Sequence, residues 1–572
     1  MTNFDVDILI VGGGPTGTSL ALELAAQGVS FRVIDKEAVR SDKSRALATQ
    51  PRSLEILNRH GIGHDIVDYG QYVRGIQLHV HQKPVTVVDL DDLGAEGTQF
   101  PLPLMLPQNN LEAVLDSCLA RYDRAVERSI VATSITQDAD GVTTILERVD
   151  GSGPPETVRS RYVVGCDGAH STVRHAAAGM RFEGGAYAQE FTLCDVRLRG
   201  GVTPPPKDRI TICMGNGVLA VFPLPDGVLR MVTPVDAGPD VGGGENNGSN
   251  KADPTAEEFQ TVLERLAPPG WGTVDEALWL ARFRLHHRAV SSYRDRRLFV
   301  AGDAAHIHSP VGGQGMNTGI QDAVNLGWKL GAVLRGESPP SLLDTYNAER
   351  RPVGQALLRG SDRAFSLVVG GGSIMSSVRN AIMPWIMPLI ARWKGGRIWI
   401  YQFVSEFGIS YRGSPVVGTG SGFPTSYWSE AILGGDRASD GNLQYYSASG
   451  ALEEGAKAPT LQGLLVGPGH HLLLFASSGP ARATEEALRQ VVDKISPLVR
   501  GKFESHFLYS GEGPKMADES RGASSYIDPE GKLHQRYGFA KQPGYVYVRP
   551  DGYIAHIGLL AKLDDFLGYL KR

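Results

Sequence analysis

The stretch RLFVAGDAAH at residues 297–306, followed by PVGGQGMN at 310–317, decides the fold of this 572-residue chain. Its apolar run, 298–301, predicts a short buried strand that ends at Gly302-Asp303. A glycine-rich loop follows, and apolar residues then recur at helical spacing from Asn317 to Leu330. Strand, loop and helix in this order place the Asp303 carboxylate at the strand end and the unpaired amides of a helix N-terminus just beyond it.

These two groups together suit a ligand that has two different parts. Asp303 can accept hydrogen bonds from the hydroxyls of a polyol chain. The helix N-terminus, expected near Gly313, carries partial positive charge and favours an anion or an electron-rich carbonyl. A polyol chain beside a ring that becomes anionic on reduction describes a flavin. A turn glycine, a capping aspartate and an ordinary buried helix are the alternative interpretation of this stretch taken alone.

The composition is typical of a globular protein with more than one domain, with 42% hydrophobic and 21% charged residues. A net charge of −5 gives no reason to expect a nucleic-acid or membrane-binding role. The sequence predicts no signal peptide before the first strand, and the most apolar later segment, 381–390, is expected to be too short and too interrupted by proline to span a membrane. Widely spaced cysteines without metal-ligand spacing predict a reducing, cytoplasmic location and no metal. The cysteines are Cys118, Cys166, Cys194 and Cys213.

A nucleotide-binding fingerprint occupies the N-terminus. An apolar strand at 7–11 leads into GGGPTG at 12–17, a helix at 19–27 and a second strand at 30–34 that ends at Asp35. Gly12 allows the tight turn, Gly14 lets the backbone approach a pyrophosphate, and Gly17 lets the helix pack on the strand. Asp35 can bind an adenosine ribose. The sequence therefore predicts dinucleotide binding, with further contacts expected from Pro15, Thr16 and Lys36.

Other polar residues are consistent with a cofactor site, but each also has a structural interpretation. Arg45 and Arg52 are either solvated arginines or cations that face a phosphate. Gln108 precedes a predicted helix, with Asn110 as its cap, and could reach a cofactor or cap a turn. Asp167 follows a strand at 161–165, so it repeats the Gly/Asp strand end of residues 302–303, although it could be an ordinary turn residue.

These three motifs, in this order, resemble those of the single-component flavoprotein aromatic hydroxylases (group A monooxygenases). The similarity is greatest to the phenol-hydroxylase-like and aromatic polyketide hydroxylase branches. The resemblance implies FAD, with Asp35 on the ribose and Asp303 on the ribityl chain. It also implies that Arg45 and Gln108 contact FAD and that the Asp167 motif serves both FAD and the nicotinamide. The remaining contacts implied for FAD come from Gly302, Pro310, Gly313, Gly315, Met316 and Asn317.

The same resemblance implies an α/β fold of the p-hydroxybenzoate hydroxylase type. A Rossmann-like FAD-binding domain takes residues 1–74, 104–178 and 285–400, and an inserted β-sheet substrate domain takes 75–103 and 179–284. A linker at 401–449 leads to a thioredoxin-like α/β domain at 450–572, which contains no cysteine and should have a structural or associative role. The inserted sheet and the loop 238–250 should set specificity. The apolar helix around 381–390 is expected to pack on the core, with a homodimer contact as the alternative.

The activity implied is an FAD- and NAD(P)H-dependent monooxygenase. NADH or NADPH docks transiently, because only one dinucleotide fingerprint is visible, and O2 then adds to the reduced FAD. The resulting flavin hydroperoxide transfers one oxygen atom to a phenolic or polycyclic aromatic substrate. Baeyer–Villiger oxidation, epoxidation and a non-catalytic FAD-containing ligand-binding protein are the alternatives. The sequence does not identify the catalytic base. The candidates, each of which could equally be structural, are Arg52, His286, His306 and His308, with Pro310 beside the last.

Overall fold

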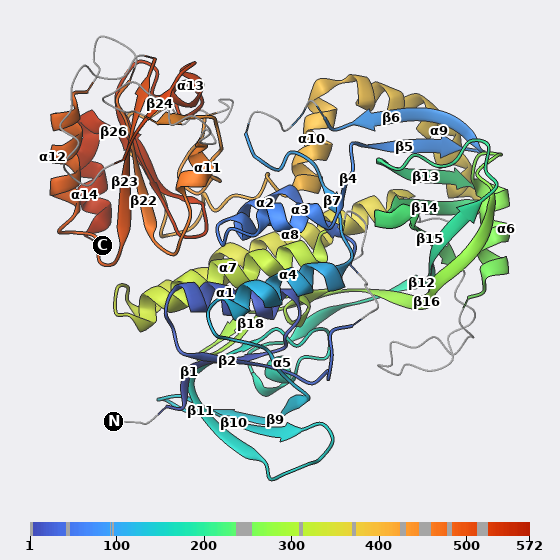
Figure 1. Ribbon diagram of the computed structural model, residues 1–572, viewed down its shortest axis with the longest axis horizontal. Helices are drawn as coiled ribbons and strands as arrows, with labels where there is room; N and C mark the ends of the chain where they lie inside the picture. The colour runs from blue at the N-terminus through green and yellow to red at the C-terminus, as the bar shows by residue number, and fades with distance from the viewer. Residues whose placement is uncertain are drawn as a thin grey trace.

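A computed structural model of the chain describes residues 4–41, 46–91, 93, 97–235, 254–307, 313–368, 373–423, 431–445, 459–477, 483–511 and 524–571. Within these ranges the side chains of 186–188, 362–368, 373–377 and 524 are left undescribed. Three large sheets surround a central group of helices (Figure 1). In that view the first sheet lies below the helices, the second to the right and the third to the left.

The first sheet has a parallel centre, in which β1 pairs with β2 on one side and with β11 on the other, and β11 pairs with β18. Parallel strands end at the same edge of a sheet, so the three predicted glycine turns meet there. The strands, in the order along the sheet, are β17 (Arg294–Asp295), β18 (Leu298–Val300), β11 (Glu156–Gly165), β1 (Val6–Val11), β2 (Phe31–Asp35) and β8 (Glu127–Arg128), with β10 (Val142–Arg148) and β9 (Ile130–Gln137) beside β11.

Helices cover this sheet, and two of them approach each other closely. α7 (Gly315–Leu334) has glycines at 319, 327 and 331, and this spacing places them on one face of the helix. That face packs on α1 (Pro15–Ala26): a methyl group on Gly319 would lie 2.4 Å from Thr16 Oγ1, and one on Gly327 would lie 2.6 Å from Glu23 Cβ. The glycines therefore let the two helices that begin at the predicted ligand touch along their length. The other helices here are α2 (Pro51–Asn58), α3 (Gly63–Asp68), α4 (Gln108–Ala120), α5 (Thr172–Ala176) and α8 (Asp344–Val368).

The second sheet is built mainly on two long antiparallel strands, β12 (Phe182–Arg199) and β16 (Thr273–Val290). Its order is β19 (His306–Ile307), β16, β12, β15 (Leu229–Val235), β14 (Gly217–Pro223), β13 (Arg209–Gly215), β5 (Gly75–Val80) and β6 (Lys83–Asp89). α6 (Ala256–Leu266) packs on it through an apolar cluster that includes Phe259 and Leu263. A small sheet, β3 (Ala48–Thr49), β7 (Leu104–Met105) and β4 (Gln71–Tyr72), lies between this region and the helices.

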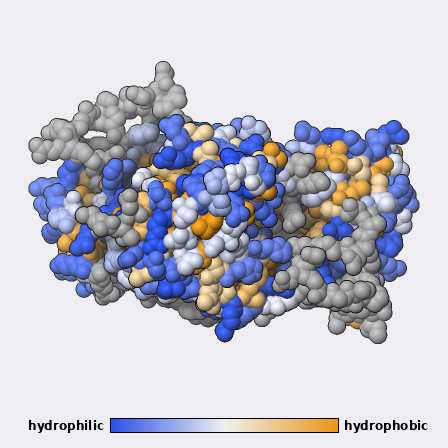
Figure 2. Space-filling view, turned by 90° about the horizontal axis from the view of Figure 1, so that it is seen from below, coloured by the Kyte–Doolittle hydropathy of each residue, from blue (hydrophilic) through white to orange (hydrophobic). Residues whose placement is uncertain are grey.

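The apolar segment 381–390 lies in α9 (Ser373–Arg392), which continues through its two prolines and is followed by α10 (Lys394–Ser405). The expectation that it packs on the core holds for one face only. Met383 is buried against Leu78 of β5, whereas Trp385 is 77% and Leu389 is 66% exposed. The homodimer contact remains a prediction. None of the described helices is long and apolar enough to cross a membrane, and hydrophilic residues cover most of the face seen in Figure 2.

The third sheet forms the C-terminal part of the chain, with order β20 (Gly418–Thr419), β26 (Ile554–Leu559), β25 (Gly544–Val548), β22 (His470–Phe475), β23 (Phe503–Ser510), β24 (Ser524–Asp528) and β21 (Gln444–Tyr445). β22, β23 and β24 are parallel, and β25 and β26 run antiparallel to β22. α12 (Glu485–Ile495) and α14 (Leu563–Leu570) cover one face, and α11 (Leu461–Leu464) and α13 (Lys532–Arg536) cover the other. β20 and β21 come from the segment expected to be a linker.

Most predicted elements occur within a few residues of their expected bounds, and the differences have local causes. α1 begins at Pro15 rather than at 19, because proline is well tolerated at the first helical position. Asn110 was wrongly expected to cap its helix. Pro107 is the N-cap, α4 starts at Gln108, and Asn110 lies inside the first turn. In the C-terminal part, Thr484 caps α12 by accepting a hydrogen bond from the Ala487 amide.

The hairpin turn between β25 and β26, residues 549–552, reaches back to the central helices through buried charged groups. Arg549 donates to both carboxylate oxygens of Glu349 on α8, at 2.7 and 3.0 Å. Lys329 of α7 donates to the same carboxylate at 2.7 Å. Asp551 accepts from Arg549 at 3.0 Å and from the Trp328 indole N–H at 3.2 Å. All of these charged side chains are at most 3% exposed.

The charges in this network determine one another's protonation. Burial alone would raise the pKa of Glu349, but the charges of Arg549 and Lys329 hold it well below its ordinary value. Burial lowers the pKa of Lys329 to about 8, against the opposing effect of Glu349. The C-terminal part is therefore joined to α7 and α8 by ion pairs that are out of contact with water, a state that is stable only while every partner is present.

Candidate functional site

The candidate site lies along the edge where β1, β11 and β18 end. The Cys166 amide donates to the Val11 carbonyl at 2.7 Å, and the Ala301 amide donates to the Gly165 carbonyl at 2.9 Å, so the three turns are held side by side. Gly12 has φ +108°, and a Cβ there would lie 2.3 Å from the Cys166 carbonyl oxygen. Only glycine fits this position, which confirms the tight turn expected from the fingerprint.

The N-terminus of α1 has the features of an anion site. Pro15 is its first residue, and its N-cap, Gly14, has extended backbone and, within this fully described helix, no side-chain cap and no acidic residue in the first turn. A methyl group on Gly14 would meet no described atom within 4 Å. The helix therefore presents unpaired amides to open space, which suits a pyrophosphate. Gly17 is buried against the Gly12 carbonyl, as expected for close helix–strand packing.

Asp35 lies at the end of β2, next to this turn. Its Oδ2 accepts a hydrogen bond from the Gly13 amide at 2.6 Å and its Oδ1 accepts one from the Glu37 amide at 2.8 Å. The carboxylate is thus fixed beside the glycine turn and keeps lone pairs for a ligand hydroxyl. Lys36 is exposed.

The Gly302-Asp303 turn forms a short 3-10 helix, η2 (Gly302–Ala304), at the end of β18. Gly302 has φ +59°, and a Cβ there would lie 2.6 Å from Thr16 Oγ1 of α1. Asp303 is exposed, while both neighbours are buried. A carboxylate is therefore held at the surface by a rigid turn, next to the N-terminal helix.

Asn317 joins the remaining predicted contacts. Its side chain is completely buried in α7, accepts a hydrogen bond from the Gln50 amide and donates to the carbonyls of Ala48 and Gly313, each at 2.8 Å. Gln108 contacts the same segment, since its amide donates to the Ala46 carbonyl at 3.2 Å, two residues before Ala48. Gly315 and Met316 open α7, which has no side-chain cap among the described residues. A second uncapped helix N-terminus thus lies near the candidate site.

The predicted catalytic residue His306 is completely buried and supports the Gly302-Asp303 turn through Asp322. Its Nε2 lies 2.7 Å from Asp322 Oδ2, and its ring stacks on Tyr293. The same carboxylate pairs with Arg350 at 2.6 Å and accepts from the Gly302 amide at 3.1 Å. Burial alone would raise the pKa of Asp322, but the positive charge of Arg350 holds it below its ordinary value. This geometry favours the bracing interpretation of His306 over the catalytic one.

Arg52 also has a structural explanation. It is 3% exposed, pairs with Glu55 at 3.0 Å, lies over the ring of Tyr553 and donates to the Asp551 carbonyl at 2.9 Å. Its guanidinium therefore belongs to the contact with the C-terminal hairpin turn. No step of the chemistry is assigned to it. His286 lies in β16 on the second sheet.

Asp167 and Arg174 tie the second motif to the third. Asp167 Oδ2 accepts from the Thr172 amide at 2.7 Å, just after the α5 N-cap Ser171, and burial raises the pKa of Asp167. Arg174 donates to the Ala304 carbonyl at 3.0 Å and lies over the ring of Phe182. These contacts support the turn interpretation of Asp167. Arg45, His308, Pro310 and the loop 238–250 lie outside the described residues.

A cavity of about 660 Å³ lies beside the first turn of α7. Its wall combines apolar and aromatic side chains with a few polar groups, contributed by α7, α8, α10 and residues 408–414. Residues that matter below are Gln314, Thr318, Val353, Phe403, Glu406 and Tyr411. None of the second-sheet residues that the structure describes is in this wall. A volume of this size is typical of small-molecule sites.

Glu406 is the polar residue in this wall that sequence reasoning missed. It follows α10 directly, has φ +62°, and is 4% exposed. Its carboxyl group accepts hydrogen bonds from Thr318 Oγ1 at 3.4 Å and from the Gln321 side chain. Burial raises its pKa to about 8, against the opposing charge of Arg350. A neutral carboxyl group beside a cavity is a feature of many ligand sites, but no sequence motif marks this one.

Comparison with known proteins gives consistent results. A family model described as "FAD binding domain" matches residues 5–361. The 6-methylpretetramide 4-monooxygenase of Streptomyces rimosus is 34% identical, over 96% of this chain and 90% of that protein. The pentachlorophenol 4-monooxygenase of Sphingobium chlorophenolicum is 31% identical, over 97% and 94%. Among solved structures, CabE, an aromatic hydroxylase from angucycline biosynthesis, is similar at a TM-score of 0.70 and 29% identity, with 99% of both chains covered.

Proposed function

Since the chain belongs to the FAD binding domain family and is an FAD-dependent aromatic monooxygenase, we propose that its substrate is a polycyclic phenol. The observation that carries this proposal is the cavity of about 660 Å³ beside α7, with Phe403 and Tyr411 in its wall. A cavity of about 150 Å³ is enough to bind benzene. The larger volume therefore has room for several fused rings, and aromatic side chains provide flat apolar surface against them.

The described residues fit FAD. The uncapped start of α1, open above Gly14, would hold the pyrophosphate, and Asp35 would hold the adenosine ribose. The exposed carboxylate of Asp303 would accept hydrogen bonds from the ribityl hydroxyls. Gln108 and the segment 46–50 would lie along the cofactor, since Asn317 holds that segment against the start of α7. FAD, when bound, takes a hydride from NADH or NADPH and activates O2 for hydroxylation of an aromatic ring.

The chain's own contribution to that chemistry is binding, orientation and electrostatics. The amides that open α7 would stabilise negative charge on the reduced ring. The carboxyl group of Glu406, neutral at pH 7, offers an O–H donor to a carbonyl or phenol oxygen of the substrate, while Thr318 and Gln321 fix its orientation. Phe403 and Tyr411 exclude water from the same space.

The C-terminal sheet is proposed to be a thioredoxin-like appendage with a structural role. Supporting this, β24, β23 and β22 are parallel, β25 and β26 are antiparallel to them, and helices cover both faces. Residues 450–572 contain no cysteine, so this part cannot carry out disulfide exchange. The assignment of the second sheet and the loop 238–250 to a substrate domain stays a prediction, because none of the second-sheet residues that the structure describes lies in the wall of the cavity beside α7.

NAD(P)H consumption and O2 uptake by the FAD-loaded protein test the substrate class. The panel contains monocyclic phenols, naphthols and polycyclic hydroxyquinones. Only its polycyclic members should stimulate NAD(P)H consumption and O2 uptake, and product NMR should locate a new hydroxyl group on the ring. Stimulation by monocyclic phenols alone would refute the proposed substrate class. A ring-expanded or epoxide product would instead favour Baeyer–Villiger oxidation or epoxidation.

The cavity itself is tested by filling it. Val353→Trp should raise the KM for the polycyclic substrate, because the indole would occupy part of the space now open between α8 and α10. Arg359→Trp, at an exposed position of the same helix that is not in the cavity wall, is the matched control. Equal KM values for the two variants would show that the substrate binds elsewhere.

A further inference from the structure

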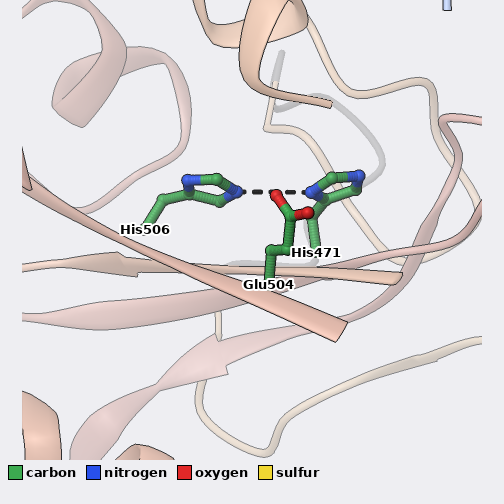
Figure 3. Close-up of side chains that lie close together, drawn as sticks. All are labelled: His471, Glu504 and His506. Carbon is green, nitrogen blue, oxygen red and sulfur yellow. Dashed lines mark hydrogen bonds between the residues drawn. The ribbon is translucent and has the colours of Figure 1, made fainter. Parts of the chain in front are cut away.

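Two buried histidines face each other on the third sheet. His471 lies in β22 and His506 in the parallel neighbour β23, where His471 is paired with Glu504 and Leu473 with His506. Side chains alternate along a strand, so all three polar residues project from the same face of the sheet. Figure 3 shows the two imidazole rings pointing at each other, with the Glu504 carboxylate beside the gap between them.

The distances suit two ligands of one ion. His471 Nδ1 lies 3.3 Å from His506 Nε2. Ligands held tetrahedrally at the usual Zn–N distance of about 2.0–2.1 Å lie about 3.3 Å apart, whereas N–H hydrogen bonds centre on roughly 2.9–3.0 Å. One ligand atom from each of His471, His506 and Glu504 lies within 4.8 Å of the others. Glu504 is exposed, so rotation of its side chain can bring the carboxylate to bonding distance.

The chemistry of the three groups is that of a zinc site. Zn²⁺ in proteins is bound by imidazole nitrogens and carboxylate oxygens, and His471, His506 and Glu504 offer two of the first and one of the second. The positive charge of Arg59 acts on His471 and works against a cation here. The Glu504 carboxylate provides the opposite charge and lies on the side open to solvent.

We propose that His471, His506 and Glu504 bind a Zn²⁺ ion, with a water molecule in the fourth position. The ion would join β22 to β23, close to where Arg59 at the end of α2 donates to the Gly467 carbonyl at 2.8 Å. It would stabilise the C-terminal part and its contact with the FAD-binding region. No step of the hydroxylation is assigned to it. The expectation of no metal rested on cysteine spacing, whereas these ligands are histidines and a glutamate from two separate strands.

Zinc retention by the full-length protein tests the proposal. The protein, carrying no histidine tag, is stripped with a chelator, mixed with ZnCl2, gel-filtered and analysed for zinc. About one zinc per chain should remain in the wild type. The same amount should remain in Glu486→Gln, which alters an exposed glutamate at the start of α12 on the opposite face of the sheet. His506→Gln should lose it while circular dichroism and FAD content stay unchanged.

Glu504→Gln provides a second test that does not depend on a buried substitution. Because Glu504 is exposed, this variant should fold normally, and its zinc affinity should fall at least about 10-fold, the loss that follows even when an indirect partner of a ligand is removed. Co²⁺ as a probe should give a visible absorption band typical of four-coordination in the wild type and in Glu486→Gln only. Wild-type protein that retains no zinc, or Glu504→Gln and Glu486→Gln proteins with equal affinity, would overturn the proposal.

Discussion

Replacing Arg549 by methionine removes the cation through which the C-terminal hairpin turn contacts α8. The arginine makes two hydrogen bonds to Glu349 and two to Asp551, all in a region that water does not reach. In the variant Glu349 keeps Lys329, but Asp551 loses its charged partner. Breaking a buried ion pair from one side costs about 3–5 kcal/mol. This corresponds to a factor of roughly 150 to 5000 in the equilibrium between joined and separated parts.

Urea unfolding followed by tryptophan fluorescence measures this loss, because Trp328 donates to Asp551 and lies under Arg549. The free energy of unfolding for the first transition should fall by about 3–5 kcal/mol in Arg549→Met. It should fall by less than about 1 kcal/mol in Arg197→Met, which breaks an exposed pair with Glu276. Combining Arg549→Met with Glu349→Gln should cost less than the sum of the single changes, since the two charges compensate each other. Additive losses, or an Arg549→Met shift no larger than that of Arg197→Met, would refute the coupling.

Three further changes test the site. Asp303→Ala should weaken FAD binding about 10- to 100-fold, because a hydrogen bond to a charged group contributes roughly 1.5–3 kcal/mol; an unchanged affinity in a fluorescence titration would remove Asp303 from the cofactor contacts. Gly12→Ala should yield protein without FAD, since its Cβ would lie 2.3 Å from a backbone carbonyl oxygen, whereas Gly151→Ala, where a Cβ would meet no described atom within 4 Å, should retain FAD. Glu406→Gln should stabilise the protein increasingly from pH 5 to pH 9, by at most about 5 kcal/mol. The folded state keeps the Glu406 proton between its ordinary pKa of 4.5 and about 8, so wild-type stability falls as the pH rises through that range. Thermal melting of both proteins across this range measures the effect, and a difference that does not grow with pH would contradict it.

The glycine turns could be predicted from the sequence because their cause is local. The tight turn at Gly12 and the strand end at Gly302 follow from the strand–turn–helix order, and the structure has both. The parallel pairing of β1, β11 and β18 then brings three distant turns to one edge, which the repeated Gly/Asp pattern anticipated.

The role of Arg52 could not be predicted, because its partners come from the far end of the chain. It donates to the carbonyl of Asp551, and nothing in residues 44–57 indicates that contact. The interpretation of a cation facing a phosphate used only the neighbouring sequence. His306 differs, since the loop-bracing alternative was already apparent, and its partner Asp322 lies within the same predicted strand–loop–helix unit.

The cavity and the histidine pair could not be predicted from the sequence for a related reason. Glu406 occupies no motif, and its raised pKa arises from burial between α7 and α10, a property of packing rather than of spacing. His471 and His506 show only strand alternation in sequence, and their meeting depends on which two strands become neighbours. The sequence therefore predicted the residues expected to contact the pyrophosphate, ribose and ribityl chain, whereas the cavity and the histidine pair could be recognised only in the structure.

α7 connects the candidate cofactor site with the buried contact to the C-terminal part. At 1.5 Å per residue, about 21 Å of this helix separates the amides near the expected flavin ring from Lys329 in the ion-pair network. Recombination between relatives is therefore constrained. A chimera that takes its C-terminal sheet from another enzyme must also take the matching residues at 325, 328, 329 and 349, or it will leave charges buried without partners beside the helix that serves the cofactor. Natural exchange of this part among hydroxylases should accordingly carry correlated changes on α7 and α8.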